Sequence, residues 1–214
     1  MVDILQQIRQ LRLIPTVVMD KAENASAFGD VLVAGGLPVA EITFRTRAAE
    51  SAIRTLAKRG DMLVGAGTIL TTEQADRAID AGAQFLVAPG TNPKVVEHVL
   101  QRGLPMVPGV ATPSEIELAT SLGVSVLKFF PAETMGGVAS LKAFAGPYPD
   151  ARFIPTGGIT PELLPDYLRL QSVVACGGSW IAPRDLLAAG RFDSIAALVE
   201  DAKKLLAGPP DIAT

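Results

Sequence analysis

The chain has 214 residues, of which 49% are hydrophobic, and it carries a formal net charge of −3 at pH 7. This apolar content is enough to fill the core of one domain, and the small negative charge argues against a general nucleic-acid or membrane-surface binder. One cysteine, Cys176, excludes an intrachain disulfide, and one histidine, His98, excludes a metal centre built from several histidines.

Segments of helical and of extended character alternate along the chain. The apolar spacing of residues 1–12 predicts an N-terminal helix. Eight apolar segments bounded by glycine, proline or polar residues predict strands: 14–19, 37–44, 62–65, 85–88, 104–108, 124–131, 152–155 and 173–176. Caps and glycine stops in the segments between them predict helices: 20–36, 47–58, 71–82, 92–103, 112–123, 138–144, one from 160, 184–189 and 194–206. The residues that would open four of these helices are Asp20, Glu23 or Asn24 in the first, Thr71 or Thr72, Asn92, and Thr112.

Strands that alternate with helices predict an α/β protein with a parallel sheet, and eight such units predict a closed (β/α)8 TIM barrel. An open doubly wound sheet is the alternative, but the first strand lacks the Gly-x-Gly-x-x-Gly turn of that fold. No linker-like stretch divides the chain. We therefore expect a single barrel domain over residues 1–214, with an extra N-terminal helix and a flexible tail at about 207–214.

One predicted strand contains a lysine. In the segment 124–131, Lys128 lies among valine, leucine and phenylalanine residues. Burying an ammonium group without a partner is costly, so burial favours the uncharged amine. A free amine in a dry pocket attacks carbonyl groups and forms a Schiff base. In the alternatives, the lysine extends from the strand end into water or pairs with a carboxylate.

Two more side chains are expected at the same end of the barrel. Active sites of such barrels lie at the C-terminal ends of the strands, where the strand at 37–44 carries Glu41 and leads to Arg45. Glu41 would carry the proton transfers of Schiff-base chemistry, or it would neutralise Lys128 as a structural ion pair. Arg45 would hold a substrate carboxylate, or it is a solvated surface arginine.

Glycine-rich loops follow the last two predicted strands. Backbone N–H groups at these two positions of a barrel often bind phosphate. A single glycine pair fits an ordinary turn equally well, but two pairs on adjacent strand ends favour a phosphate site. Thr68 and Thr156 add hydroxyl groups at the rim, where each would also fit a turn or a helix cap. The loops are Gly157-Gly158 and Gly177-Gly178-Ser179.

The strand ends carry seven motifs in order: Glu41-Ile42-Thr43-x-Arg45-Thr46, Gly65-Ala66-Gly67-Thr68, Pro89-Gly90, Pro108-Gly109, Leu127-Lys128-Phe129-Phe130-Pro131-Ala132, Thr156-Gly157-Gly158-Ile159 and Gly177-Gly178-Ser179-Trp180. Together they resemble the 2-keto-3-deoxy-6-phosphogluconate aldolase family, which includes the 4-hydroxy-2-oxoglutarate aldolases. The resemblance extends over residues 13–206. Each motif alone is common, whereas their order is specific.

The resemblance implies a class I aldolase that needs no metal and no other cofactor, in a barrel that assembles as a homotrimer. It implies that Lys128 forms the Schiff base and that Glu41 is the general acid/base. The other implied positions bind substrate: Arg45 and Thr68 the pyruvate carboxylate, Pro89 and Phe130 the walls of that pocket, Thr156 the sugar portion, and Gly157, Gly158, Gly178 and Ser179 the phosphate.

The implied reaction is a step of the Entner-Doudoroff pathway, the cleavage of 2-dehydro-3-deoxy-6-phosphogluconate to pyruvate and glyceraldehyde 3-phosphate. Cleavage of 4-hydroxy-2-oxoglutarate to pyruvate and glyoxylate is implied as a second activity. An aldolase for the galactonate epimer is an alternative, but residues 43–46 and Thr156 favour the gluconate substrate. From the residues alone, a phosphosugar isomerase or epimerase without a covalent lysine, and a non-catalytic barrel that binds a phosphorylated ligand, also stay open.

The expected partner is therefore a small phosphorylated keto acid. We expect no nucleic-acid or membrane partner, because the basic residues form no run along the sequence. The N-terminal residues include charges and no long apolar run, so we expect neither a signal peptide nor a membrane span. These features together predict a cytoplasmic protein.

Overall fold

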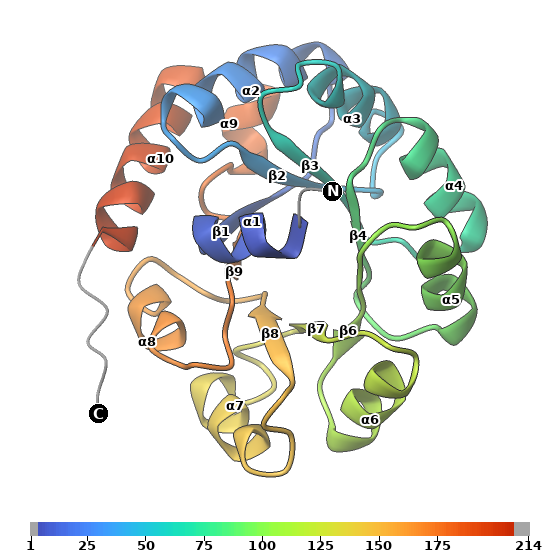
Figure 1. Ribbon diagram of the computed structural model, residues 1–214. Helices are drawn as coiled ribbons and strands as arrows, with labels where there is room; N and C mark the ends of the chain where they lie inside the picture. Colours follow the sequence, from blue (N-terminus) through green and yellow to red (C-terminus); the bar gives the residue numbers. More distant parts are fainter. Residues whose placement is uncertain (1–3, 208–214) are drawn as a thin grey trace.

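Short parallel strands form the centre of the molecule, and helices surround them (Figure 1). The computed structural model describes residues 4–207. The strands are β1 (Leu13–Val17), β2 (Val39–Thr43), β3 (Leu63–Gly67), β4 (Phe85–Val87), β5 (Met106–Val107), β6 (Gly109–Val110), β7 (Val126–Phe129), β8 (Arg152–Pro155) and β9 (Cys176–Gly178). The helices are α1 (Ile4–Leu11), η1 (Ala22–Asn24), α2 (Ala25–Ala34), α3 (Ala49–Ala57), α4 (Thr72–Asp80), α5 (Pro93–Gln101), α6 (Pro113–Ser121), α7 (Gly137–Ala145), α8 (Leu164–Leu168), α9 (Arg184–Ala188) and α10 (Phe192–Leu206).

Two sheets close the barrel, one in the order β5-β4-β3-β2-β1-β9 and the other in the order β6-β7-β8. Only Pro108 separates β5 from β6, and its carbonyl oxygen accepts a hydrogen bond from the Lys128 N–H at 2.8 Å. On the opposite side, Thr156 after β8 pairs with Gly177 in β9. Because β5 and β6 act as halves of one strand, the strands occupy eight positions, and the predicted TIM barrel is confirmed.

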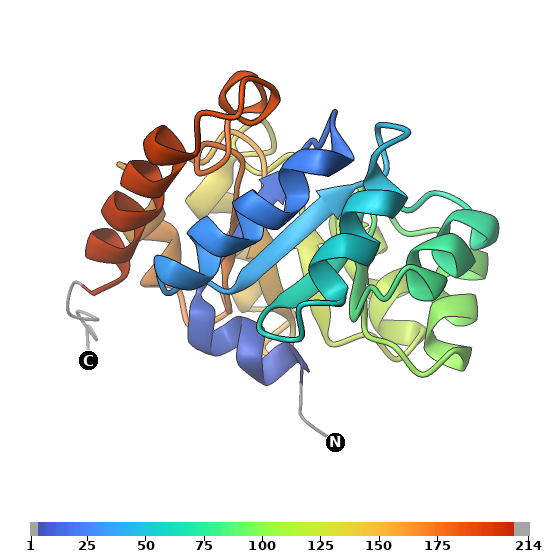
Figure 2. The same cartoon turned by 90° about the horizontal axis from the view of Figure 1, so that it is seen from above.

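Helix α1 lies across the end of the barrel at which the strands begin (Figures 1 and 2). The helical spacing of its apolar residues turns Ile8 into the core, where it is fully buried. The predicted N-terminal helix is therefore confirmed over Ile4–Leu11. Helix α1 therefore covers the N-terminal ends of the strands, whereas loops surround their C-terminal ends.

The last strand lies later in the sequence than predicted. The apolar segment at 173–176 leads into β9, but the strand itself is Cys176–Gly178. Its Gly177 and Gly178 pair with Ile14 and Pro15 of β1. Strand propensity disfavours glycine and therefore points to the valines before it. Close packing explains the glycines, because a Cβ on Gly177 would lie only 2.3 Å from the Thr156 hydroxyl oxygen.

The predicted helix caps are confirmed in the middle of the chain and wrong near its start. Three side chains accept a hydrogen bond from the first turn of their helix as expected: Thr71 of α4, Asn92 of α5 and Thr112 of α6. Asn24 caps nothing, because its side chain donates to the Leu187 carbonyl at 2.6 Å. The helix expected from 160 begins only at Leu164, after a turn.

Two expectations fall partly on the ends of the chain. Residues 1–3 of the predicted N-terminal helix and residues 208–214 of the predicted tail lie outside the described residues. Within the described range 4–207, no helix has the length and apolar character needed to span a membrane.

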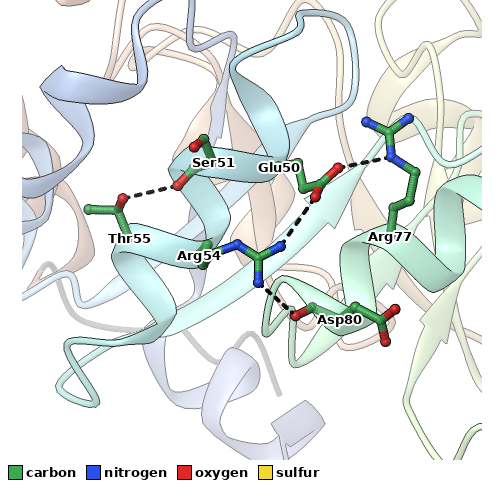
Figure 3. A network of polar contacts seen from close by, with 6 residues as sticks. All are labelled: Glu50, Ser51, Arg54, Thr55, Arg77 and Asp80. Atoms are coloured by element: carbon green, nitrogen blue, oxygen red, sulfur yellow. Dashed lines mark hydrogen bonds and ion pairs between the residues drawn. The ribbon is translucent and has the colours of Figure 1, made fainter.

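A carboxylate on the outer wall joins helices α3 and α4 (Figure 3). Glu50 accepts hydrogen bonds from Arg54 at 3.2 Å and from Arg77 at 2.9 Å. Arg54 also donates to the Asp80 carbonyl oxygen at 3.2 Å, so one arginine holds both helices. The network ties together the helices that follow β2 and β3.

The same network predicts a small, pH-dependent contribution to stability. The hydrogen bond from Arg77 is the main reason why the pKa of Glu50 lies below its ordinary value of 4.5. Because the unfolded chain then binds the proton more readily, the stabilisation is present above about pH 4.5 and is lost as the pH falls through the lower folded-state pKa. We expect Glu50→Gln to reduce the free energy of unfolding by at most about 1 kcal/mol at pH 7. Urea unfolding at several pH values measures this free energy for both proteins. A difference between them that grows as the pH falls would contradict the prediction.

Candidate active site

Lys128 and Glu41 meet inside the barrel. The Lys128 Nζ lies 3.2 Å from Glu41 Oε1, and the two side chains are only 5% and 4% exposed. They approach from separate parts of the wall, since Lys128 is on β7 and Glu41 on β2. The structure thus joins the lysine and the glutamate that the sequence singles out. Lys128 does not extend into water, so that alternative is wrong.

Two glycines on the strands beside this pair have no space for a side chain. Gly67 of β3 faces the carboxylate, and a Cβ there would lie 2.1 Å from Glu41 Oε1. Gly109 of β6 pairs with Lys128, and a Cβ there would lie 2.1 Å from the Pro89 carbonyl oxygen. The loop after β4 therefore packs close to the strand beside the lysine. A larger residue at either glycine would displace these groups.

A buried amine and carboxylate at this distance can do more than stabilise the fold. A buried ion pair contributes little net stability, because desolvation of both charges offsets their attraction. The same pair is suited to covalent chemistry, in which the amine adds to a carbonyl and the carboxylate relays protons over hydrogen-bond distance. The half-buried Phe130 ring covers one side, with its centroid 5.3 Å from the Lys128 Nζ.

Arg45 and Thr68 form the next contact outward. The exposed Arg45 donates from Nε to the Thr68 hydroxyl at 3.2 Å. Thr68 has a φ of 60°, in the left-handed region that a β-branched residue rarely adopts. Such backbone strain is concentrated at functional sites, where the surrounding structure holds it. Residues expected at the carboxylate end of the site therefore lie in contact, directly after β2 and β3.

The two glycine loops lie at the ends of β8 and β9, as predicted. Gly157 and Gly158 have φ angles of 103° and 81°, which only glycine adopts without strain. Gly178 ends β9, and the exposed Ser179 follows it. The buried Thr156 pairs with Gly177 and so joins the two loops.

Three polar residues near these loops and strands are not singled out by the sequence. Thr16 pairs in register with Glu41, and its buried hydroxyl has no hydrogen-bond partner among the described residues. Glu133 follows β7, and its carboxylate accepts a hydrogen bond from the Tyr167 hydroxyl. No local pattern brings residues 34 positions apart together. A lone threonine or tyrosine within an apolar segment gives no sign of such a position.

The chain's single cysteine and histidine lie outside this site. Burial raises the pKa of the Cys176 thiol, so it stays protonated and unreactive. His98 bonds to Asp76 at 2.9 Å between helices α5 and α4. Residues 4–207 contain no cluster of histidine, cysteine and acidic side chains able to hold a metal ion.

A sequence model of the KDPG and KHG aldolase family, named for 2-keto-3-deoxy-6-phosphogluconate and 2-keto-4-hydroxyglutarate, matches residues 4–198. A 2-dehydro-3-deoxy-phosphogluconate aldolase of Treponema pallidum is 45% identical over 207 residues, covering 96% of this chain and 99% of that relative. A KHG/KDPG aldolase of Escherichia coli K12 is 44% identical and covers 89% of this chain and 90% of its own.

Solved structures agree with these sequence relatives. A KDPG aldolase from Legionella pneumophila, with pyruvate captured as a covalent carbinolamine intermediate, superimposes with a TM-score of 0.89. It is 34% identical, and the match covers 92% of this chain and 97% of that chain. The similarity in both sequence and structure therefore extends over the whole barrel.

Proposed function

The chain belongs to the KDPG and KHG aldolase family, and from this premise we propose that it is a class I aldolase acting through a Schiff base on Lys128. The reaction cleaves 2-dehydro-3-deoxy-6-phosphogluconate to pyruvate and glyceraldehyde 3-phosphate. The observation that carries the proposal is the buried Lys128 amine 3.2 Å from the Glu41 carboxylate. This is a nucleophile and a proton carrier within direct reach of each other.

The chemistry proceeds in two halves. The neutral Lys128 amine adds to the C2 ketone, and Glu41 transfers the protons that turn the carbinolamine into a protonated imine and water. The imine then accepts the electron pair of the C3–C4 bond as the C4 hydroxyl passes its proton to Glu41, which releases glyceraldehyde 3-phosphate. The resulting enamine takes up a proton at C3, and water hydrolyses the imine to pyruvate and the free amine.

Residues at the two ends of the site hold the substrate across the lysine. Arg45 and Thr68 bind the carboxylate, which suits a planar guanidinium beside a hydroxyl. Pro89 and Phe130 line the pyruvate pocket, and Thr156 contacts the sugar chain. The phosphate is bound by Gly157, Gly158, Gly178 and Ser179. Binding at both ends fixes the C3–C4 bond next to the imine, which lowers the entropic part of the barrier.

The same site serves a second substrate, 4-hydroxy-2-oxoglutarate, with glyoxylate as the product. The E. coli relative is named for both activities. Both substrates share the keto-acid end that Lys128, Arg45 and Thr68 would hold, and they differ in the part that leaves. We also propose a single-domain barrel in the cytoplasm, as the sequence features predict, and a homotrimer, as the resemblance implies.

Reduction with borohydride in the presence of pyruvate tests the covalent step. Hydride converts the imine to a stable secondary amine, so we expect one pyruvate-derived adduct, located at Lys128 by digestion and mass spectrometry. Borohydride without pyruvate is the control and leaves the lysine unmodified. An intact protein that gives no adduct, or gives one at another lysine, would refute the proposed mechanism.

A further inference from the structure

A buried tyrosine holds an exposed glutamate beside the glycine loop after β8. Tyr167 of α8 is fully buried, and its hydroxyl donates a hydrogen bond to the Glu133 carboxylate. Burial and this neighbouring carboxylate raise the pKa of Tyr167, so the phenol keeps its proton and remains a donor. Glu133 itself is exposed, in the loop between β7 and α7.

Glu133 is bound to the glycine loop through its backbone and through its side-chain stem. Its N–H donates to the Gly157 carbonyl at 3.1 Å, next to a bond from the Ala132 N–H to the Thr156 carbonyl at 2.9 Å. A Cβ on Gly158 would lie only 2.7 Å from the Glu133 Cβ. The glutamate stem therefore packs directly against the loop that we assign to phosphate binding.

The charged end of Glu133 lies beyond the loop. A Cβ on Gly137 would lie 2.9 Å from Glu133 Oε1 and 3.0 Å from the Tyr167 hydroxyl oxygen. Gly137 and Tyr167 thus border the carboxylate, whereas the carbons of its stem border Gly158. Without the tyrosine hydroxyl, this flexible side chain would be free to bring its negative charge toward a bound phosphate, and like charges repel.

We infer that Tyr167 and Glu133 position the Gly157-Gly158 loop for the phosphate end of the substrate and thereby select phosphorylated over unphosphorylated keto acids. The inference rests on the proposed aldolase function. Neither residue takes part in bond making. Tyr167 acts through Glu133, and Glu133 acts through the loop, so both are positioning residues with an effect confined to one end of the substrate.

The test compares two substrates that differ only in the phosphate: 2-dehydro-3-deoxy-6-phosphogluconate, the substrate proposed above, and 2-dehydro-3-deoxygluconate. In Tyr167→Phe, which removes one hydroxyl, we expect kcat/KM for the phosphorylated substrate to fall about 10-fold, the effect of one hydrogen bond to a charged group. The fall appears mainly in KM. The value for the unphosphorylated substrate and the borohydride adduct with pyruvate stay unchanged.

Tyr148→Phe is the matched control, because Tyr148 also donates to a glutamate, Glu117, at 2.9 Å on the outside of the barrel. It should leave both substrates unaffected. A second variant adds Glu133→Gln to Tyr167→Phe. Removing the freed charge should restore part of the lost affinity for the phosphorylated substrate, and a further loss would contradict the inference.

The outcomes separate the inference from the function on which it rests. Equal losses on both substrates in Tyr167→Phe, or no loss on either, overturn the positioning role while the pyruvate adduct keeps the aldolase mechanism intact. If the protein without any substitution cleaves both substrates equally well, the assignment of the phosphate site and this inference are both wrong. If that protein forms no pyruvate adduct, the proposed function itself is wrong.

Discussion

Lys128→Ala should abolish aldol cleavage and the pyruvate adduct together. Because the lysine forms the covalent bond that makes C3–C4 cleavage possible, we expect kcat to fall at least about 10⁴-fold, as for other nucleophiles whose removal ends the covalent route. A coupled assay for released pyruvate measures the rate, and borohydride trapping measures the adduct. A variant that keeps a hundredth of the original rate would rule out Lys128 as the nucleophile.

Two further variants separate the loss of a nucleophile from damage to the fold. Lys128→Arg keeps a positive charge beside Glu41 but offers no amine for an imine, so it should be as inactive as Lys128→Ala and more stable. Lys142→Ala removes an exposed lysine from α7 and should leave activity unchanged. If Lys128→Arg retained activity, the positive charge at position 128 would be sufficient for catalysis, and the covalent mechanism would be wrong.

The sequence predicts the barrel because its signals are local. Periodic apolar segments, capping residues such as Thr112 and glycine stops each report on a few neighbouring residues, and their repetition leads to eight units. The β9 strand escapes this reasoning, since Gly177 and Gly178 are strand residues only because β1 and Thr156 approach them so closely. Contacts between distant segments determine which residues form such a strand, and the strand propensity of a residue carries no information about these contacts.

The candidate site also contains residues that the sequence indicates and residues that only the folded structure brings together. Lys128 is visible in the sequence because a charge within an apolar strand conflicts with burial, and Glu41 because it lies at the mouth-facing end of its strand. The meeting of Glu133 with Tyr167 cannot be read from either segment, because each residue is unremarkable in its own surroundings. It depends on how α8 packs behind the loop after β7, and only the folded chain brings them together.

Glu41→Gln should leave the fold nearly unchanged and slow every step that moves a proton. The amide has the same shape and can still accept a hydrogen bond from Lys128, but it can no longer take up and release protons. Loss of general acid–base catalysis typically costs about 10²–10⁴-fold, and we expect a decrease in kcat within that range. Exchange of the methyl protons of pyruvate with deuterated water, followed by NMR, should slow in parallel, because it requires the same transfers to the enamine.

The surface variant Glu50→Gln makes the identical substitution outside the barrel and should leave both rates unchanged. Borohydride trapping should still find the adduct in Glu41→Gln, formed more slowly, since the amine itself remains. This pattern distinguishes a proton carrier from a structural ion-pair partner, the alternative that the geometry alone leaves in place. If Glu41 only neutralises Lys128, exchange and cleavage in Glu41→Gln would continue at the original rates, because other groups would then carry the proton transfers.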